Sequence, residues 1–255
     1  MKKIDTKSEV KINTFYNEDD VQKRNALQDL FEQTPIPKEE LFNNMGLFVD
    51  RRNLSRFLYM NELYQKILTI HGSIVEFGVR YGQNIALLTS LRGIYEPFNH
   101  NRKIIGFDTW EGFTSVDSSK DTENWDSGDF GVPQNYELYL EKVINIHEQM
   151  APIPNIKKHT LVKGDAITTI DEYLTKHQES IISFVYFDFD LYKPTKECLE
   201  KILPYLSRGA VIAFDEINVH EFPGETKAFR EVLGTNNFKV HHSIYRANAG
   251  YIVYE

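Results

Sequence analysis

The segment Glu76-Phe77-Gly78-Val79-Arg80-Tyr81-Gly82 ends an apolar run and leads into a helical pattern. Its two glycines have a Gly-x-x-x-Gly spacing, which differs from the Gly-x-Gly-x-x-Gly fingerprint of dinucleotide-binding folds. Glycine lets the backbone approach a ligand closely, where a Cβ would not fit. An acid at the start of the turn suits a ligand with a cationic amino group, whereas it would repel a pyrophosphate. The segment therefore predicts a ligand-binding strand-to-helix turn and argues against NAD or FAD.

Apolar runs and helical patterns alternate around this turn. We expect strands at 73–77, 104–107, 160–162, 181–187 and 210–214, with helices between them at 84–91, 136–147, 168–176 and 195–203. Because each crossover helix must bury its apolar stripe, the alternation predicts a parallel sheet covered on both faces. The last runs, 240–245 and 251–254, have no helix between them and suit an antiparallel pair. The prediction is an α/β fold with a mostly parallel seven-stranded sheet and an antiparallel C-terminal edge.

The N-terminal part has a different character. Residues 1–50 are charged and weakly patterned, so we expect them to form a cover that is separate from a domain at 51–255. Apolar residues recur at helical spacing over 54–68 and predict a helix that ends before His71-Gly72. The longest expected loop, 109–135, is rich in Asp, Ser, Gly and Trp, which favours a lid.

Composition narrows the class of protein. The 255 residues, 41% of them hydrophobic, suffice for one sizeable core, and 29 basic against 37 acidic residues argue against nucleic acid as a partner. The single cysteine, Cys198, excludes an internal disulfide framework, and its amphipathic helical setting indicates a buried small residue rather than a nucleophile. The N-terminus lacks the apolar region of a signal peptide, and no apolar run reaches about 18 residues. We therefore expect a cytoplasmic protein without a membrane span.

Two further expected strands end in acids. The run 104–107 leads into Asp108-Thr109-Trp110, and the run 160–162 leads into Lys163-Gly164-Asp165-Ala166. Ligands of open α/β sheets bind at the carboxyl ends of the strands, where an acid takes both ribose hydroxyls. Together with Glu76, these acids favour a nucleoside cofactor over the alternative that each is a helix cap. In S-adenosylmethionine methyltransferases the first acid meets the methionine end, the second the ribose and the third the adenine. The residues expected to bind S-adenosylmethionine are Glu76, Gly78, Tyr81, Gly82, Asp108, Thr109, Trp110, Asp165, Ala166 and Asp188.

The remaining strands also end in acids. The run 181–187 leads into Asp188-Phe189-Asp190, and 210–214 leads into Asp215-Glu216. Four carboxylates at neighbouring strand ends repel one another unless protons or a cation intervene, and oxygen ligands suit Mg²⁺. A metal there would hold a substrate hydroxyl and lower its pKa. The alternative is that Asp188 and Asp215 are caps and Asp190 is exposed. Among the histidines, only His220 lies where a general base is useful.

Several stretches of roughly residues 45–255 resemble the macrocin-type O-methyltransferases, a family that includes enzymes for antibiotic deoxysugars and many proteins of bacterial surface-polysaccharide gene clusters. They are Leu54-Ser55-Arg56-Phe57-Leu58, Glu76 to Gly82, Phe107-Asp108-Thr109-Trp110-Glu111-Gly112-Phe113, Asp188-Phe189-Asp190-Leu191-Tyr192 and Phe214-Asp215-Glu216. The resemblance implies a class I, Rossmann-like methyltransferase fold, S-adenosylmethionine as donor, Mg²⁺ and a sugar hydroxyl as acceptor. It assigns the metal to Asp188, Asp215 and Glu216, with Asp190 in support.

The chain departs from the family pattern at two positions. Glu216 stands where the antibiotic enzymes usually have a second Asp, although its longer side chain can still bind a metal. Leu191 stands where related catechol-type and caffeoyl-type enzymes have a Lys, so the general base stays open between Asp188, His220 and a residue of the N-terminal cover. The segment Phe222-Pro223-Gly224-Glu225-Thr226 is more similar to the polysaccharide branch. It favours a sugar or nucleotide-linked glycan precursor as acceptor.

Two rival functions remain at this point. A nucleotide-sugar glycosyltransferase would use Asp188-Phe189-Asp190 as an Asp-x-Asp motif, but this leaves 76–82 unexplained. A non-catalytic binding protein would not need acids at every strand end. We further expect a homodimer, because the aromatic-rich segment 48–64 lies outside the sheet core. The alternative is that this helix packs on its own sheet.

Overall fold

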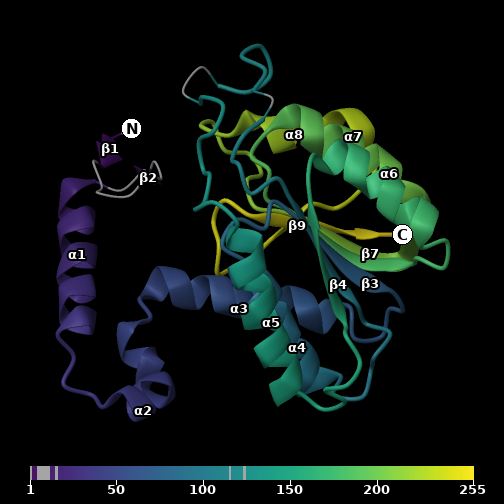
Figure 1. Cartoon of the computed structure of the whole chain (residues 1–255). Helices are drawn as coiled ribbons and strands as arrows, with labels where there is room; N and C mark the ends of the chain where they lie inside the picture. The colour runs from purple at the N-terminus through teal and green to yellow at the C-terminus, as the bar shows by residue number, and fades with distance from the viewer. Residues whose placement is uncertain (1, 5–11, 15–16, 115, 123–124) are drawn as a thin grey trace.

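The computed structural model describes residues 2–4, 12–14, 17–114, 116–122 and 125–255. Its centre is a seven-stranded sheet with the order β5-β4-β3-β6-β7-β9-β8 (Figure 1). The strands are β3 (Ser73–Phe77), β4 (Ile104–Asp108), β5 (His159–Lys163), β6 (Ile182–Phe187), β7 (Leu206–Phe214), β8 (His241–His242) and β9 (Gly250–Tyr254). Strands β3 to β7 pair in parallel, whereas β9 is antiparallel to β7 and β8. The predicted parallel sheet with an antiparallel C-terminal edge is confirmed.

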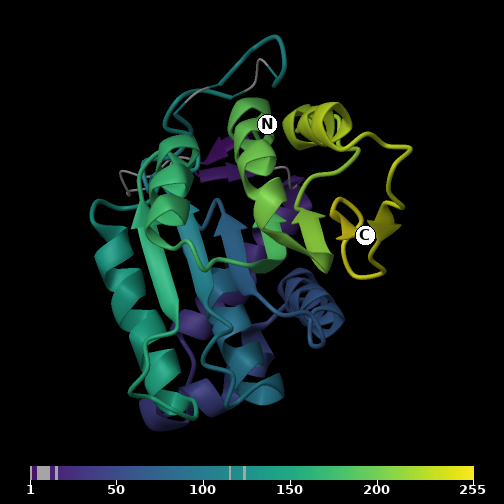
Figure 2. The ribbon, with the colours of Figure 1, turned by 90° about the vertical axis from the view of Figure 1, so that its right-hand side faces the viewer.

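Helices cover both faces of this sheet, as Figures 1 and 2 show. One face carries α3 (Arg51–Lys66), α4 (Gln83–Tyr95) and α5 (Tyr136–Met150), and the other carries α6 (Ala166–Lys176), α7 (Tyr192–Ile202) and α8 (Pro223–Val232). In β6, Phe184 and Tyr186 join the first apolar cluster, while Val185 and Phe187 join the second. Because both faces are buried, the strands are apolar throughout rather than alternating. Cys198 is buried in the second cluster, as its helical setting predicted.

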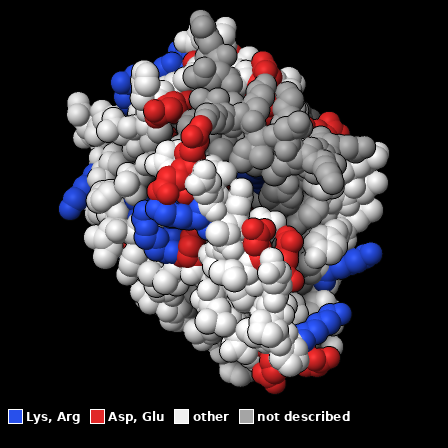
Figure 3. Space-filling model, turned by 90° about the vertical axis from the view of Figure 1, so that its left-hand side faces the viewer, with Lys and Arg blue, Asp and Glu red and all other residues white. Residues whose placement is uncertain are grey.

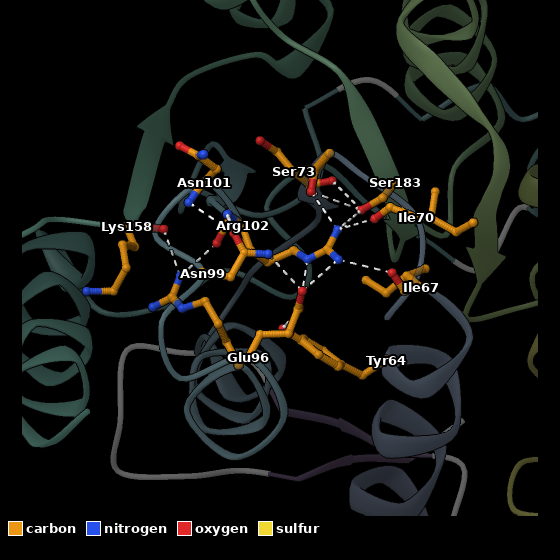
Figure 4. Close-up of polar contacts among 12 residues, drawn as sticks. Tyr64, Ile67, Ile70, Ser73, Glu96, Asn99, Asn101, Arg102, Lys158 and Ser183 are labelled. Carbon is orange, nitrogen blue, oxygen red and sulfur yellow. Dashed lines mark hydrogen bonds and ion pairs between the residues drawn. The ribbon is translucent and has the colours of Figure 1, made fainter. Parts of the chain in front are cut away.

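The ends of the strands opposite the glycine turn are held together by Arg102 (Figure 4). Its guanidinium donates to the carbonyls of Ile67 (3.0 Å) and Ile70 (2.9 Å) and to the Ser183 hydroxyl (2.7 Å). It also pairs with both carboxylate oxygens of Glu96, at 2.8 and 2.9 Å. Since its donors all find acceptors, the buried charge is compensated. This end of the sheet is therefore filled by structural contacts.

The N-terminal part consists of short elements. They are β1 (Lys2–Ile4), β2 (Ile12–Thr14), α1 (Glu18–Glu32), α2 (Lys38–Leu41) and the 3-10 helix η1 (Phe42–Phe48). Helix α1 stands beside the sheet domain in Figure 1, and none of its residues is buried. It touches its neighbours through the Phe31–Phe48 ring contact at 5.0 Å and the Asp20–Arg52 ion pair at 2.7 Å. On the face that carries α1, acidic and basic side chains are interspersed (Figure 3).

The boundaries differ from the predictions in places with a local cause. Helix α3 begins earlier than expected because Asp50 caps it by accepting the N–H groups of Arg52 and Asn53. Helix α8 was not predicted; it begins with Pro223, and proline is favourable in the first turn of a helix. The expected strand 240–245 is reduced to His241–His242, and a 3-10 turn, η2 (Leu203–Tyr205), precedes β7. Among the described helices, none has the length and apolar character needed to cross a membrane.

Candidate active site

A cavity of about 600 Å³ lies at the carboxyl ends of the parallel strands. The predicted site residues that line it are Gly78, Tyr81, Gly82, Asp108, Thr109, Asp165, Ala166, Asp188, Asp215 and Glu216. Residues from both the expected donor set and the expected metal set therefore share one cavity. Glu76, Trp110 and His220 are not among its lining residues.

Glu76 is nevertheless close to this cavity through its partner. Its Oε1 accepts a hydrogen bond from Nδ2 of Asn84 (2.8 Å), and Asn84 lines the cavity. Among the described residues, no group hydrogen-bonds to its buried Oε2. Burial raises the pKa of Glu76 well above its usual range. A buried carboxyl group with one unsatisfied oxygen suits a cationic partner.

The two glycines of the turn are required by contacts within the protein. Gly78 has φ +85°, and a Cβ on it would lie 2.0 Å from the carbonyl oxygen of Asp188. Gly82 has φ +78°, and its Cβ would lie 2.3 Å from Leu140. The sequence suggested only a close ligand approach, but the turn at Gly78 also packs directly against Asp188, the residue that follows β6.

The second and third acids accept backbone N–H groups, Asp108 from its own turn and from the glycine turn, and Asp165 from the helix that follows it. Asp108 accepts the N–H groups of Arg80 (2.7 Å) and Trp110 (2.6 Å). Trp110 is buried in the core, and its indole N–H donates to the Arg80 carbonyl at 3.0 Å. Trp110 therefore supports the glycine turn from the core side. Asp165 caps α6 by accepting the N–H of Ile167 at 3.0 Å. Asp165 is therefore a helix cap that also faces the cavity.

The acidic cluster at the ends of β6 and β7 includes two arginines that the sequence reasoning missed. Asp215 pairs with Nη2 of Arg56 (3.3 Å) and Nη2 of Arg246 (2.9 Å), and the Tyr186 hydroxyl donates to its other oxygen. Arg56 also lies 3.7 Å from Oδ2 of Asp188 and donates to the Asn84 side chain at 3.5 Å. Arg56 therefore links the donor end of the cavity to the acidic end. Its place within the family-like stretch 54–58 was the available signal.

Charge is unevenly distributed within this cluster. Burial and the nearby Asp215 raise the pKa of Asp188 to about 7 and that of Glu216 to about 8. Burial also acts on Asp215, but Arg56 and Arg246 hold its pKa below the usual range. The repulsion among the acids is thus relieved partly by protons and partly by arginines.

The fit of a metal ion to these acids is partial. Among the described residues, no hydrogen-bond partner reaches the buried Oε2 of Glu216, as a vacant ligand atom requires. Within the same described ranges, no three His, Cys, Asp or Glu side chains are grouped closely enough to hold an ion. Asp215 would have to exchange at least one arginine for a cation. The alternative that Asp188 and Asp215 are helix caps finds no support, because neither caps a helix.

Comparison with known proteins identifies the family. Residues 75–217 match a family profile described as a methyltransferase domain. The crystal structure of CalS11, a calicheamicin methyltransferase, shares 37% sequence identity, covers 94% of each chain and has a TM-score of 0.90. The chain belongs to the S-adenosylmethionine-dependent methyltransferase family.

Other comparisons agree with this methyltransferase assignment. The apo structure of CalS11, described as a TDP-rhamnose 3'-O-methyltransferase, has 36% identity, covers 94% of this chain and 96% of its own, and has a TM-score of 0.83. The O-methyltransferase NovP, at 12% identity and a TM-score of 0.56 over 79% of this chain and 80% of its own, shares the fold alone. No curated protein sequence matches the chain. The comparisons confirm the class I methyltransferase fold and give no support to a glycosyltransferase.

Described residues of the segment 109–135, which was expected to be a lid, form one wall of the methyltransferase cavity. Its Trp125 ring stacks on Phe222 with centroids 4.8 Å apart, and Asp121 accepts the N–H of Tyr192 at 2.8 Å. Phe113 and Phe222 line the cavity. The described part of this segment is therefore docked against the start of α7 and α8. His220, one of the expected bases, is exposed and lies outside the cavity lining.

Proposed function

We propose that the enzyme transfers the methyl group of S-adenosylmethionine to a hydroxyl of a sugar, carried on a nucleotide or another glycan precursor. The observation that carries the proposal is one cavity lined by both the donor residues and an acidic cluster beside them. CalS11, which resembles the chain over 94% of its length, is named for methyl transfer to TDP-rhamnose. The geometry and the relative together favour O-methylation of a sugar.

In this proposal, the donor lies over the ends of β3, β4 and β5. Glu76 receives its amino group, Asp108 its ribose and Asp165 the adenine side, while the glycine turn supports its methionine part. The acceptor then lies over Asp188, on the neighbouring strand. This division places the hydroxyl beside the methyl group, which is the arrangement that in-line transfer requires.

Asp188 is the base that we favour, because it lines the cavity and His220 does not. A divalent metal, which we assign to Asp188, Asp215 and Glu216 with Asp190 nearby, would lower the pKa of the acceptor hydroxyl. Tyr186 and Arg246 hold Asp215 in place through its two oxygens. Asp188 accepts the hydroxyl proton as the oxygen attacks the methyl group.

Activity is tested with S-adenosylmethionine labelled in its methyl group and a panel of TDP-, UDP- and GDP-sugars. We expect one sugar nucleotide to gain the mass of a CH₂ group and the label, with S-adenosylhomocysteine as second product. A small-molecule extract of the source cell serves as the unbiased comparison. Methylation of a non-sugar compound alone would contradict the proposal.

Metal dependence is tested by chelation. We expect excess EDTA to lower turnover by more than roughly 100-fold. Affinity for S-adenosylhomocysteine should stay nearly unchanged, because the donor lies over other strands. Added Mg²⁺ should restore the rate, which controls for damage to the protein. Full turnover in EDTA would mean that the carboxylates act without a metal.

We further propose a homodimer. The reason is now a different apolar surface from the segment 48–64 on which the sequence-based expectation rested. Tyr59, Leu63 and Tyr64 of the segment 48–64 pack in the chain's own core, as the alternative for this helix had it. Phe42, however, is 86% exposed, and Leu47 beside it is 67% exposed. Apolar surface of this kind favours an interface with a second copy.

Sedimentation at micromolar concentration tests the dimer. We expect a dimer for the parent protein and a shift toward monomer for Phe42→Ser, because the change removes apolar surface without touching the core. Lys23→Ser, on the exposed face of α1, is the control. A parent protein that sediments as a monomer would rule the idea out.

A further inference from the structure

The segment Phe222-Pro223-Gly224-Glu225-Thr226 contacts the two loops that carry the acidic cluster. Glu225, in the first turn of α8, is completely buried. Its Oε1 accepts the N–H groups of Phe189 (3.0 Å) and Asp190 (3.2 Å), and its Oε2 accepts the N–H of Glu216 (3.1 Å). One carboxylate therefore joins the backbone after β6 to the backbone after β7.

These N–H groups lie where the backbone leaves the sheet after β6 and after β7. The N–H of Asp188 still donates to Phe77 (2.9 Å), and that of Asp215 to Phe187 (2.9 Å), within the strand ladder. The next N–H groups have no neighbouring strand to bond with, and Glu225 accepts them. The N–H groups of Phe189 and Asp190 converge on one oxygen of Glu225, as in a backbone anion nest.

The neighbours of Glu225 are fitted to the same loops. A Cβ on Gly224 would lie 2.5 Å from the backbone nitrogen of Tyr192 and 2.6 Å from the carbonyl oxygen of Asp190. The Thr226 hydroxyl accepts the N–H of Asn218 at 2.9 Å. Gly224 allows the close approach of the backbones. Glu225 binds the loops after β6 and β7, and Thr226 binds the loop after β7.

We propose that Glu225 is a positioning residue that sets the separation and orientation of Asp188 relative to Asp215 and Glu216. It is not among the residues that line the cavity, so it acts through the backbone of the acids that do. Three backbone N–H groups bonded to the two oxygens of one buried side chain fix the distance between the two loops. The inference rests on the proposed function in so far as these acids receive the acceptor.

The test compares Glu225→Gln with Glu225→Asp. Gln keeps the shape of the side chain but turns an NH₂ group toward a backbone donor, whereas Asp keeps the charge and loses the reach. For both variants we expect kcat per donor-binding site to fall about 10- to 100-fold, with S-adenosylhomocysteine affinity and the donor KM within about twofold. Glu200→Gln, the same change at an exposed position of α7, is the control and should leave both values unchanged.

Amide hydrogen exchange gives a readout that needs neither acceptor nor metal. In Glu225→Gln, peptides containing 188–190 and 215–217 should exchange at least about tenfold faster, while a peptide containing 104–108 should not change. If the parent methylates no sugar, the proposed function fails. Amide exchange then still tests whether Glu225 holds the loops after β6 and β7. Unchanged exchange would overturn the inference that Glu225 holds the two loops. Unchanged kcat per site would overturn its positioning role.

A purely structural role predicts a different pattern. It would lower the unfolding midpoint and the number of donor-binding sites, and leave kcat per site unaltered. A purely electrostatic role would be rescued by Glu225→Asp. If Glu225→Gln does not fold, Thr226→Val removes one contact of the same segment, and the positioning role then predicts a loss of kcat of about threefold or more with donor affinity retained. An unaltered kcat in that variant would also overturn the proposal.

Discussion

Replacing Asp188 with Asn is expected to reduce turnover by roughly 1000-fold while the affinity for S-adenosylhomocysteine changes by less than about threefold. Asn has almost the same shape, so the close contact between the Asp188 backbone and Gly78 is kept. It cannot accept a proton from the acceptor hydroxyl, and it is a weaker ligand for a divalent cation. Calorimetry for binding and a methyl-transfer assay for turnover measure the two effects separately.

Asp171→Asn, at an exposed position of α6, is the matched control for this substitution. It should leave both turnover and binding unchanged. A loss of donor affinity in Asp188→Asn that exceeds about tenfold would show that Asp188 also contacts the donor, as expected from the sequence. Turnover that survives the substitution would move the base to another residue.

The replacement Gly78→Val is expected to abolish S-adenosylhomocysteine binding and to lower the unfolding midpoint. Gly78 has φ +85°, a region that β-branched residues rarely adopt, and its Cβ would meet the Asp188 carbonyl oxygen at 2.0 Å. The contacting atom belongs to the backbone of Asp188, directly after β6, so it cannot move aside as a flexible side chain would. The turn and the end of β6 must therefore separate, which disturbs the donor and acceptor ends together.

The control for this replacement is Gly46→Ala, because a Cβ at Gly46 meets no atom within 4 Å. It should bind S-adenosylhomocysteine like the parent. If Gly78→Val also bound it with parental affinity, the donor would have to lie elsewhere in the chain. Thermal unfolding followed by circular dichroism separates loss of the site from loss of the fold.

The two arginines change how a metal can act in this enzyme. Arg56 and Arg246 both pair with Oδ2 of Asp215, so the most strongly ionised acid of the cluster already has cationic partners. Asp188 and Glu216, whose pKa values are raised to about 7 and 8, are the acids whose protons a cation would displace. Metal binding would therefore shift the arginine pairing around Asp215 rather than fill an empty cluster of carboxylates.

The sequence by itself determined the alternation of strands and helices from β3 to β7, the parallel sheet and the acids at the ends of five strands. These features follow from local periodicity, since apolar runs, glycine turns and the residue after a strand are all read within a short window. The N-terminal part escaped prediction for the same reason. No side chain of α1 is buried, so the sequence of this helix has no apolar stripe from which it could be predicted.

Only the tertiary structure decided which side chains meet around those acids. Arg56 reaches Asp215 across 159 residues of sequence, and Glu225 reaches Phe189 across 36. Trp110 turns into the core and His220 stays exposed, although both follow predicted strands closely. Such contacts depend on how distant segments pack in space, and local patterns constrain only the direction of a side chain relative to its own strand or helix.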